Sequence, residues 1–196
     1  AMFEDHATKS WWRQATGEAI AGPLTGGKLP EVPAIQSSLG TWLKLYPGSL
    51  IMQPDSNFSE IYDSLSDFES GQRSGRLTRR DTASWLDKSW IAGIDLGEVS
   101  KAYDWNELVS KGVINDTPGS IPISVIVTAD QKSLFAFRRH SIEQQLTFRN
   151  DTLTDGAVDY TLAGTAMDST SKSLYLLPVY QEYWHSWRTF HPNTFR

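Results

Sequence analysis

Histidine is the most versatile acid, base and metal ligand in this sequence, and it occurs four times, at His6, His140, His185 and His191. None of the four lies in a nucleophile motif such as Gly-x-Ser-x-Gly, so no catalytic triad is indicated. His185 and His191 are six residues apart, whereas two ligands on one helix face are three or four apart. Pro192 pushes His191 out of helical geometry, which would let its ring turn toward another ligand. A capping or hydrogen-bonded surface imidazole is the favoured interpretation of both, and no metal site is predicted.

Three other polar side chains could belong to a site. Glu18 lies in a predicted strand near Trp11 and Trp12, where an unpaired buried carboxylate would be costly, so it needs a partner such as Arg13. A general acid or base with a raised pKa is the alternative. Asn115 and Asp116 precede Thr-Pro-Gly, a pattern typical of a turn that bonds its own backbone, with a ligand contact as the alternative.

These residues define one candidate pocket, whose catalytic roles stay unassigned: Glu18, Asn115, Asp116, His185 and His191. The leading hypothesis is a non-enzymatic module that binds a small ligand or a partner protein in a cleft between two pseudo-repeats. The alternative is a hydrolase-like or metal-assisted enzyme that holds Glu18, Asp116 and His191 in one hydrogen-bonded shell. A third hypothesis is an interaction piece completed by a partner or a second copy, which an unpaired sheet edge near residues 3–20 would favour. No cofactor is predicted.

Composition excludes several classes of partner. The 196 residues carry a net charge of −5, and the pI is near 5.3, so neither a nucleic-acid groove nor an anionic membrane surface is expected. No apolar run is long enough to cross a bilayer, which predicts a soluble chain without membrane insertion. With no cysteine, disulfides and thiolate chemistry are excluded, while the compartment stays open. A homo-oligomer or a protein partner is compatible with these totals.

An internal repeat organises the chain. A shift of 145 residues aligns five pairs without a gap: Leu29 with Leu174, Pro33 with Pro178, Trp42 with Trp187, Pro47 with Pro192, and Ser49 with Thr194. Ala21-Gly22 also aligns with Ala163-Gly164 when three residues are inserted. Each copy predicts a strand, an Ala-Gly turn, an apolar connector, an aromatic helix and a proline stop. Trp42, Trp184 and Trp187 have helical spacing and are interpreted as structural staples of the core.

The remaining patterns predict mostly strands. A hairpin is expected over residues 3–21, a short helix after Ser37 or Ser38 followed by a strand over 49–52, and an amphipathic helix over 55–70. A second hairpin over 90–103 leads into a helix that begins at Asp104 and ends before Gly112. Five short strands follow, over residues 121–127, 133–138, 145–149, 157–162 and 173–177.

The predicted fold is therefore α+β and strand-dominated, with antiparallel sheets or a barrel, short helices and two pseudo-repeats. Residues 1–70 would form the closing unit of the first repeat plus the amphipathic helix. Residues 71–88 would be a solvated, arginine-bearing linker, and 89–196 would form the complete second repeat, all packed as one compact domain.

Three stretches resemble a bacterial family known as domain of unknown function 3179: residues 12–24 (WRQATGEAIAGPL), 112–117 (GVINDT) and 184–194 (WHSWRTFHPNT). The resemblance runs from Met2 to the end and skips residues 54–88. It implies two tandem halves, each with an opening unit of hairpin, helix and Asn-Asp-Thr and a closing unit that ends near His-Pro. It implies a bacterial source, is compatible with export, and carries no activity. The usual first opening unit and its Cys-Pro-x-Cys-Gly segment are not present here, and Tyr46-Pro47-Gly48 replaces the usual His-Pro-Asp.

Overall fold

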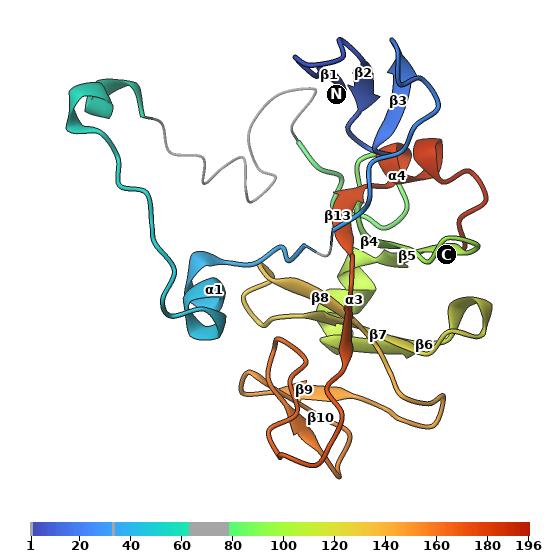
Figure 1. Ribbon diagram of the computed structural model, residues 1–196. Helices are drawn as coiled ribbons and strands as arrows, with labels where there is room; N and C mark the ends of the chain where they lie inside the picture. The colour runs from blue at the N-terminus through green and yellow to red at the C-terminus, as the bar shows by residue number, and fades with distance from the viewer. Residues whose placement is uncertain (1, 33, 63–78) are drawn as a thin grey trace.

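Four antiparallel sheets and short helices make up the computed structural model in Figure 1, which describes residues 2–32, 34–62 and 79–196. The predicted strand-dominated α+β class is confirmed. The barrel alternative is wrong, because the strands of the described residues divide into four separate open sheets.

The N-terminal sheet contains β1 (Met2–Glu4), β2 (Trp11–Arg13) and β3 (Glu18–Ala21) in the order β1-β2-β3. The first turn is held by Asp5, whose carboxylate accepts hydrogen bonds from Thr8 N at 2.6 Å and from Trp12 Nε1 at 3.0 Å. The hairpin predicted over residues 3–21 is present, and one further strand extends it. The sheet lies close to helix α4 in Figure 1.

The central sheet has the order β12-β8-β7-β6, with β6 (Val113–Asp116), β7 (Ile123–Val127), β8 (Leu134–Arg138) and β12 (Tyr175–Leu177). All five residues of β7 are buried, because both faces of the sheet are covered. Val125 belongs to one hydrophobic cluster and the next residue, Ile126, to another, as the alternation of side chains along a strand requires.

The two faces of the central sheet have different covers. On one face, α3 (Trp105–Lys111) contributes Trp105 and Leu108 to the first cluster. The other face packs against a small sheet of β9 (Thr147–Arg149), β10 (Thr152–Thr154) and β11 (Asp159–Tyr160), in the order β11-β10-β9. Leu153 and Tyr160 of this small sheet belong to the second cluster.

The last sheet joins distant parts of the chain, with β4 (Trp90–Asp95) between β5 (Ser100–Asp104) and β13 (Tyr180–Tyr183). The predicted hairpin over 90–103 and the Asp104 cap are confirmed, since Asp104 accepts a hydrogen bond from Glu107 N at 3.3 Å. Gly112 ends α3 with a φ of 72°, a conformation that suits glycine. Helix α4 (Trp184–Phe190) follows β13 directly and buries Trp184 and Trp187.

Helix α1 (Leu39–Leu45) begins at Ser38, whose hydroxyl accepts a hydrogen bond from Thr41 N at 3.2 Å, as predicted. The strand predicted over 49–52 is wrong: these residues have no partner strand among the described residues, and an isolated extended segment gains no ladder hydrogen bonds. In Figure 1, α1 and the segment after it lie apart from the N-terminal sheet.

The amphipathic helix predicted over 55–70 is wrong for the part that the structure describes. Residues Ser56–Ile61 form the 3₁₀ helix η1, capped by Asp55, which accepts a hydrogen bond from Asn57 N at 2.9 Å. Phe58 and Ile61 are 53% and 75% exposed, so the apolar face is not covered by any of the described residues, and packing is what stabilises most short helices. The rest of this helix and most of the predicted linker over 71–88 lie outside the described residues.

Candidate functional site

A cavity of about 420 Å³ lies between the N-terminal sheet and the last helix. Its wall is formed by the β2–β3 turn, the segment that follows Gly27, and the C-terminal β13–α4 unit. We call it the His191 pocket; it is lined by residues 14–17 and 28–32 and by Asp95, Tyr180, Glu182, Trp187, Phe190 and His191.

His191 is held in place by the end of helix α4. Its backbone N–H donates to Trp187 O at 2.9 Å, and its imidazole stacks on the Trp187 indole with the ring centroids 3.8 Å apart. Nδ1 lies 3.2 Å from Trp187 O, and Nε2 lies 3.6 Å from Asp95 Oδ2. The helix end thus orients one ring nitrogen toward the backbone and the other toward a carboxylate, which becomes an ion pair when the ring is protonated.

Strand β13 supplies two further groups to the wall. Tyr180 and Glu182 are two residues apart, so they lie on the same face of the strand. The Tyr180 hydroxyl donates a hydrogen bond to Glu31 Oε1. Burial raises the pKa of Tyr180 well above its usual value, and the hydrogen bond and negative charge of Glu31 raise it further. Tyr180 therefore stays a neutral hydrogen-bond donor at physiological pH.

Two polar atoms of the wall are buried without a hydrogen bond within the described part of the chain: the acceptor Glu182 Oε2 and the hydroxyl oxygen of Thr16, which can donate or accept. A buried polar atom without a partner costs about 1–3 kcal/mol, and more when it belongs to a charged group. A bound ligand or an ordered water in the cavity would supply the missing partner.

The charge of the pocket is predominantly negative. Glu31, Asp95 and Glu182 contribute carboxylates, against the single ammonium of Lys28. In residues 2–32, 34–62 and 79–196, no group of three or more His, Asp or Glu side chains is placed to hold a metal ion. Excess acceptors without a metal-binding geometry suit an organic group that donates hydrogen bonds.

Of the five residues of the sequence-predicted pocket, only His191 lines this cavity. Glu18 is exposed and pairs with Arg13, its Oε2 lying 3.0 Å from Nη1, which is the partner that the sequence predicted. His185 is also exposed, and its ring stacks on Tyr183 with the centroids 6.0 Å apart.

Asn115 and Asp116 end strand β6 and belong to a separate polar network. The Asn115 side chain donates to Leu146 O at 2.9 Å and accepts from Leu146 N at 3.0 Å and Ser124 Oγ at 2.6 Å. It thereby ties the central sheet to the segment that leads into β9. All three hydrogen bonds of the Asn115 side chain are made to other residues of the protein, as in a structural role.

Asp116 is the charged centre of that network. Its carboxylate accepts from Tyr103 OH at 2.9 Å and lies 2.5 Å from Lys101 Nζ. Burial by itself would raise the pKa of Asp116, but hydrogen bonds from Lys101, the Thr117 N–H and Tyr103 outweigh burial and lower it. The carboxylate is therefore held ionised, as in a structural ion pair. Glu18, Asp116 and His191 thus have three separate sets of partners.

The three tryptophans interpreted as staples differ in burial. Trp184 is 4% exposed and Trp187 is 1% exposed, and both belong to one hydrophobic cluster with Ile91 and Ala102. Trp42, by contrast, is 36% exposed.

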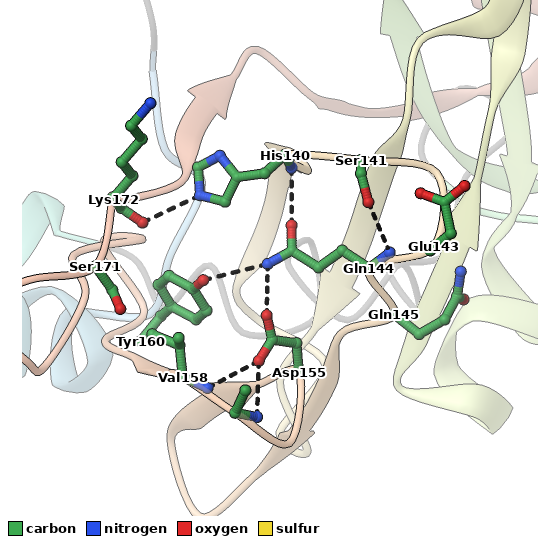
Figure 2. Close-up of a pocket in the computed structure, with 11 residues that line it drawn as sticks. His140, Ser141, Glu143, Gln144, Gln145, Asp155, Val158, Tyr160, Ser171 and Lys172 are labelled. Atoms are coloured by element: carbon green, nitrogen blue, oxygen red, sulfur yellow. Dashed lines mark hydrogen bonds between the residues drawn. The ribbon is translucent and has the colours of Figure 1, made fainter.

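A second hollow, of about 610 Å³, lies beside His140. Figure 2 shows the Gln144 side chain between its neighbours, where Oε1 accepts from His140 N at 2.7 Å and Nε2 donates to Asp155 Oδ2 at 2.7 Å. His140 Nε2 lies 3.0 Å from the carbonyl oxygen of Lys172. The side chains of His140, Gln144 and Asp155 in this hollow are thus bonded to neighbouring parts of the chain and connect its loops.

Sequence reasoning missed Glu31, Asp95, Tyr180 and Glu182 as members of the pocket. The sequence predicts Asp95 only as part of the hairpin over residues 90–103, and it predicts Glu31 only as part of an apolar connector. Tyr180 and Glu182 come from β13, a strand whose partner β4 is about ninety residues away in sequence, so no local pattern brings these groups together.

Two comparisons found nothing: no curated protein and no solved structure matches the chain. No helix among the described residues is long and apolar enough to span a membrane. One family model does match, over residues 1–194, and it is described as a protein of unknown function, DUF3179. The match covers the stretches that carry the resemblance in the sequence, so the chain belongs to the DUF3179 family.

Proposed function

We propose that the protein is a binding module that holds a small organic cation, an amine or similar group, in the His191 pocket. The observation that carries this proposal is the carboxylate of Glu182, which lines the cavity and has one buried oxygen without a donor within the described residues. Because this oxygen is itself inaccessible to solvent, an ammonium group held in the cavity would satisfy it once the Glu182 carboxylate turns toward the cavity, which would offset its desolvation.

The size and composition of the cavity support a small ligand. Its volume of about 420 Å³ lies within the range of roughly 300–1,000 Å³ that is usual for small-molecule sites. Trp187 and Phe190 provide apolar contact area, while Glu31, Asp95 and Glu182 provide acceptors. A ligand with a short alkyl part and a protonated amine would match both features. A nucleic acid, whose phosphates would be repelled by these carboxylates, would not.

The enzyme hypothesis has less support. It requires Glu18, Asp116 and His191 to share one shell, whereas Glu18 pairs with Arg13 and Asp116 pairs with Lys101. The His191–Asp95 contact provides an oriented imidazole, but the two ring nitrogens lie against Trp187 O and Asp95 Oδ2, so no hydroxyl nucleophile of the described residues is hydrogen-bonded to this base.

Thermal unfolding of the full chain with two matched probes tests the charge requirement. 1,4-Diaminobutane and 1,4-butanediol have the same carbon chain and differ in charge. Since a ligand at one hundred times its dissociation constant stabilises a protein by about 2.7 kcal/mol, the diamine is expected to raise Tm by several degrees, while the diol leaves Tm unchanged. Equal shifts with both probes, or none with the diamine, would contradict the proposal.

A further inference from the structure

Two helical units of the chain have the same local structure. The first helical unit is residues 35–52, with α1, and the second helical unit is residues 180–196, with α4. Each helix has seven residues, and each C-cap residue has nearly the same backbone angles, φ −132° and ψ 71° at Tyr46 against φ −128° and ψ 67° at His191. Trp42 Nε1 donates to Ser49 Oγ at 2.8 Å, and Trp187 Nε1 donates to Thr194 Oγ1 at 2.9 Å.

The units also contact each other at equivalent positions. Gln36 Nε2 donates to Gln181 Oε1 at 2.5 Å, and the two glutamines are 145 residues apart, the same spacing that separates α1 from α4. When two copies of a unit are related by a two-fold axis, each copy presents the same surface to the other, so equivalent residues meet at the axis. The contact between Gln36 and Gln181 is the contact that such an axis between the two helical units would produce.

The second helical unit is covered by the β4–β5 hairpin at three places. Strand β13 pairs with β4, the indole of Trp187 lies on Gly93, and the C-terminal segment extends along β5. In this last contact, Phe195 N donates to Ser100 O at 3.0 Å and Ala102 N donates to Phe195 O at 2.9 Å. The hairpin leaves Trp187 1% exposed and Trp184 4% exposed.

The first helical unit has no such cover in the described part of the chain. Trp42 and Leu39, the counterparts of Trp187 and Trp184, are 36% and 56% exposed. Leu50, the counterpart of Phe195, is 99% exposed, and no strand pairs with its segment. Residues 35–38 use one edge to bond the central sheet, since Leu134 N donates to Gln36 O at 2.9 Å and Ser38 N donates to Ser133 Oγ at 3.0 Å. Their opposite edge carries no strand, and among the described residues the places of the indole contact and of the C-terminal contact are open as well.

A second copy of the chain does not supply the cover. The described residues of each copy contain one β4–β5 hairpin, and that hairpin already covers the second helical unit of the same copy. Ile91, Ala92 and Ile94 of β4 are fully buried there. A dimer would hold two such hairpins and four helical units, so two units would stay open.

We propose that the first helical unit is a docking surface for an antiparallel β-hairpin of the β4–β5 type on a separate polypeptide. Glycine on the inner face of this hairpin lets the Trp42 indole approach, as Gly93 does for Trp187. One edge of the hairpin pairs with residues 35–38 and the other with residues 49–52. The occupant is recognised by backbone hydrogen bonds and by the tryptophan, the mode of binding known as β-augmentation.

A labelled cyclic hairpin peptide with the sequence of residues 90–104 tests this proposal by fluorescence anisotropy with the full chain. Saturable binding is expected, with affinity at least tenfold lower for Trp42→Ala than for the unsubstituted chain. Trp11→Ala removes a tryptophan of similar exposure, 43%, from another surface and is expected to leave binding unchanged.

A second probe keeps the test independent of the folding of any variant. The same peptide with Gly93→Val carries a side chain where the indole must lie, so its binding to the unsubstituted chain is expected to fall at least tenfold. Equal binding of the two peptides, or no binding of the first, overturns the proposal. So does a concentration-dependent dimer of the chain that Trp42→Ala abolishes, because a second copy would then cover the helix.

Discussion

The indole ring of Trp187 lies directly on the backbone of Gly93, where a β carbon would be only 2.4 Å from Trp187 Cε3. The same indole stacks with the imidazole of His191, and the two ring centroids are 3.8 Å apart. Gly93 therefore sets how closely α4 approaches the sheet, and through Trp187 it sets the position of His191 in the pocket wall.

Gly93→Ala is expected to destabilise the protein by about 2–3 kcal/mol, because an inserted methyl group in a close-packed contact forces the helix or the ring to move. Urea unfolding followed by tryptophan fluorescence measures this change. Gly40→Ala is the matched control, since a β carbon there meets only Ser38 Oγ at 4.0 Å and alanine favours a helix. A loss at Gly40 as large as that at Gly93 would contradict the assigned contact.

Arg139 is 3% exposed, and its guanidinium donates to four carbonyl oxygens, those of Ile123, Ile142 and Asp116 at 3.1, 2.9 and 2.9 Å and that of Gln144. Lysine cannot reproduce this planar set of donors. Arg139→Lys is thus expected to lower the free energy of unfolding by about 2–3 kcal/mol, because buried carbonyls lose charged donors. The neighbouring Arg138 is exposed, so Arg138→Lys in the same denaturation assay should change stability by less than about 0.5 kcal/mol.

Asp116 gives the fold a dependence on acid. Because its pKa is lowered in the folded state, its contribution is present above the unfolded pKa of about 4 and is lost as pH falls through the folded value. The free energy of unfolding of the wild type should therefore fall more between pH 6 and pH 3 than that of Asp116→Asn. Parallel pH profiles for the two proteins would show that the Lys101–Asp116 pair contributes no such linkage.

Glu182 carries a cost in the ligand-free protein. Its buried oxygen accepts no hydrogen bond within the described residues, so Glu182→Gln, which removes the charge, is expected to raise the free energy of unfolding by about 1 kcal/mol without ligand. Chemical denaturation at pH 7 measures the change. A variant less stable than the wild type would mean that the carboxylate already has a stabilising partner.

Local patterns in the sequence predicted the elements whose partners are close along the chain. The 90–103 hairpin, the Ser38 and Asp104 helix caps and the Gly112 stop each depend on residues within one or two turns. The 55–70 helix failed in its described part because periodicity indicates an apolar face without indicating whether a surface exists to cover it. The repeat and the division into units stay predictions.

The candidate site was predicted only at His191. Glu182 has the sequence context of an aromatic strand, and nothing local indicates that it lines the same cavity as Asp95 and the Thr16 turn. The pairing of β13 with β4 creates that proximity, and such long-range pairing leaves no signal in a single sequence. Glu18 was recognised as a charge in need of a partner, which proved to be Arg13. Asp116 was interpreted as a turn residue, with a ligand contact as the alternative, and its ion pair with Lys101 was not predicted.

The most direct test of the binding proposal is isothermal titration of the full chain with 1,4-diaminobutane at pH 7, for the wild type, Glu182→Gln and Glu98→Gln. Glu98 is exposed and does not line the pocket. Because Glu98→Gln also removes one carboxylate, it has the same net charge as Glu182→Gln and serves as the control. The proposal predicts one binding site per chain in the wild type and in Glu98→Gln. Binding to Glu182→Gln should be at least tenfold weaker, because the variant loses a charge-assisted hydrogen bond worth about 1.4 kcal/mol or more. Equal affinities for the three proteins, or no heat of binding in the wild type, would contradict it.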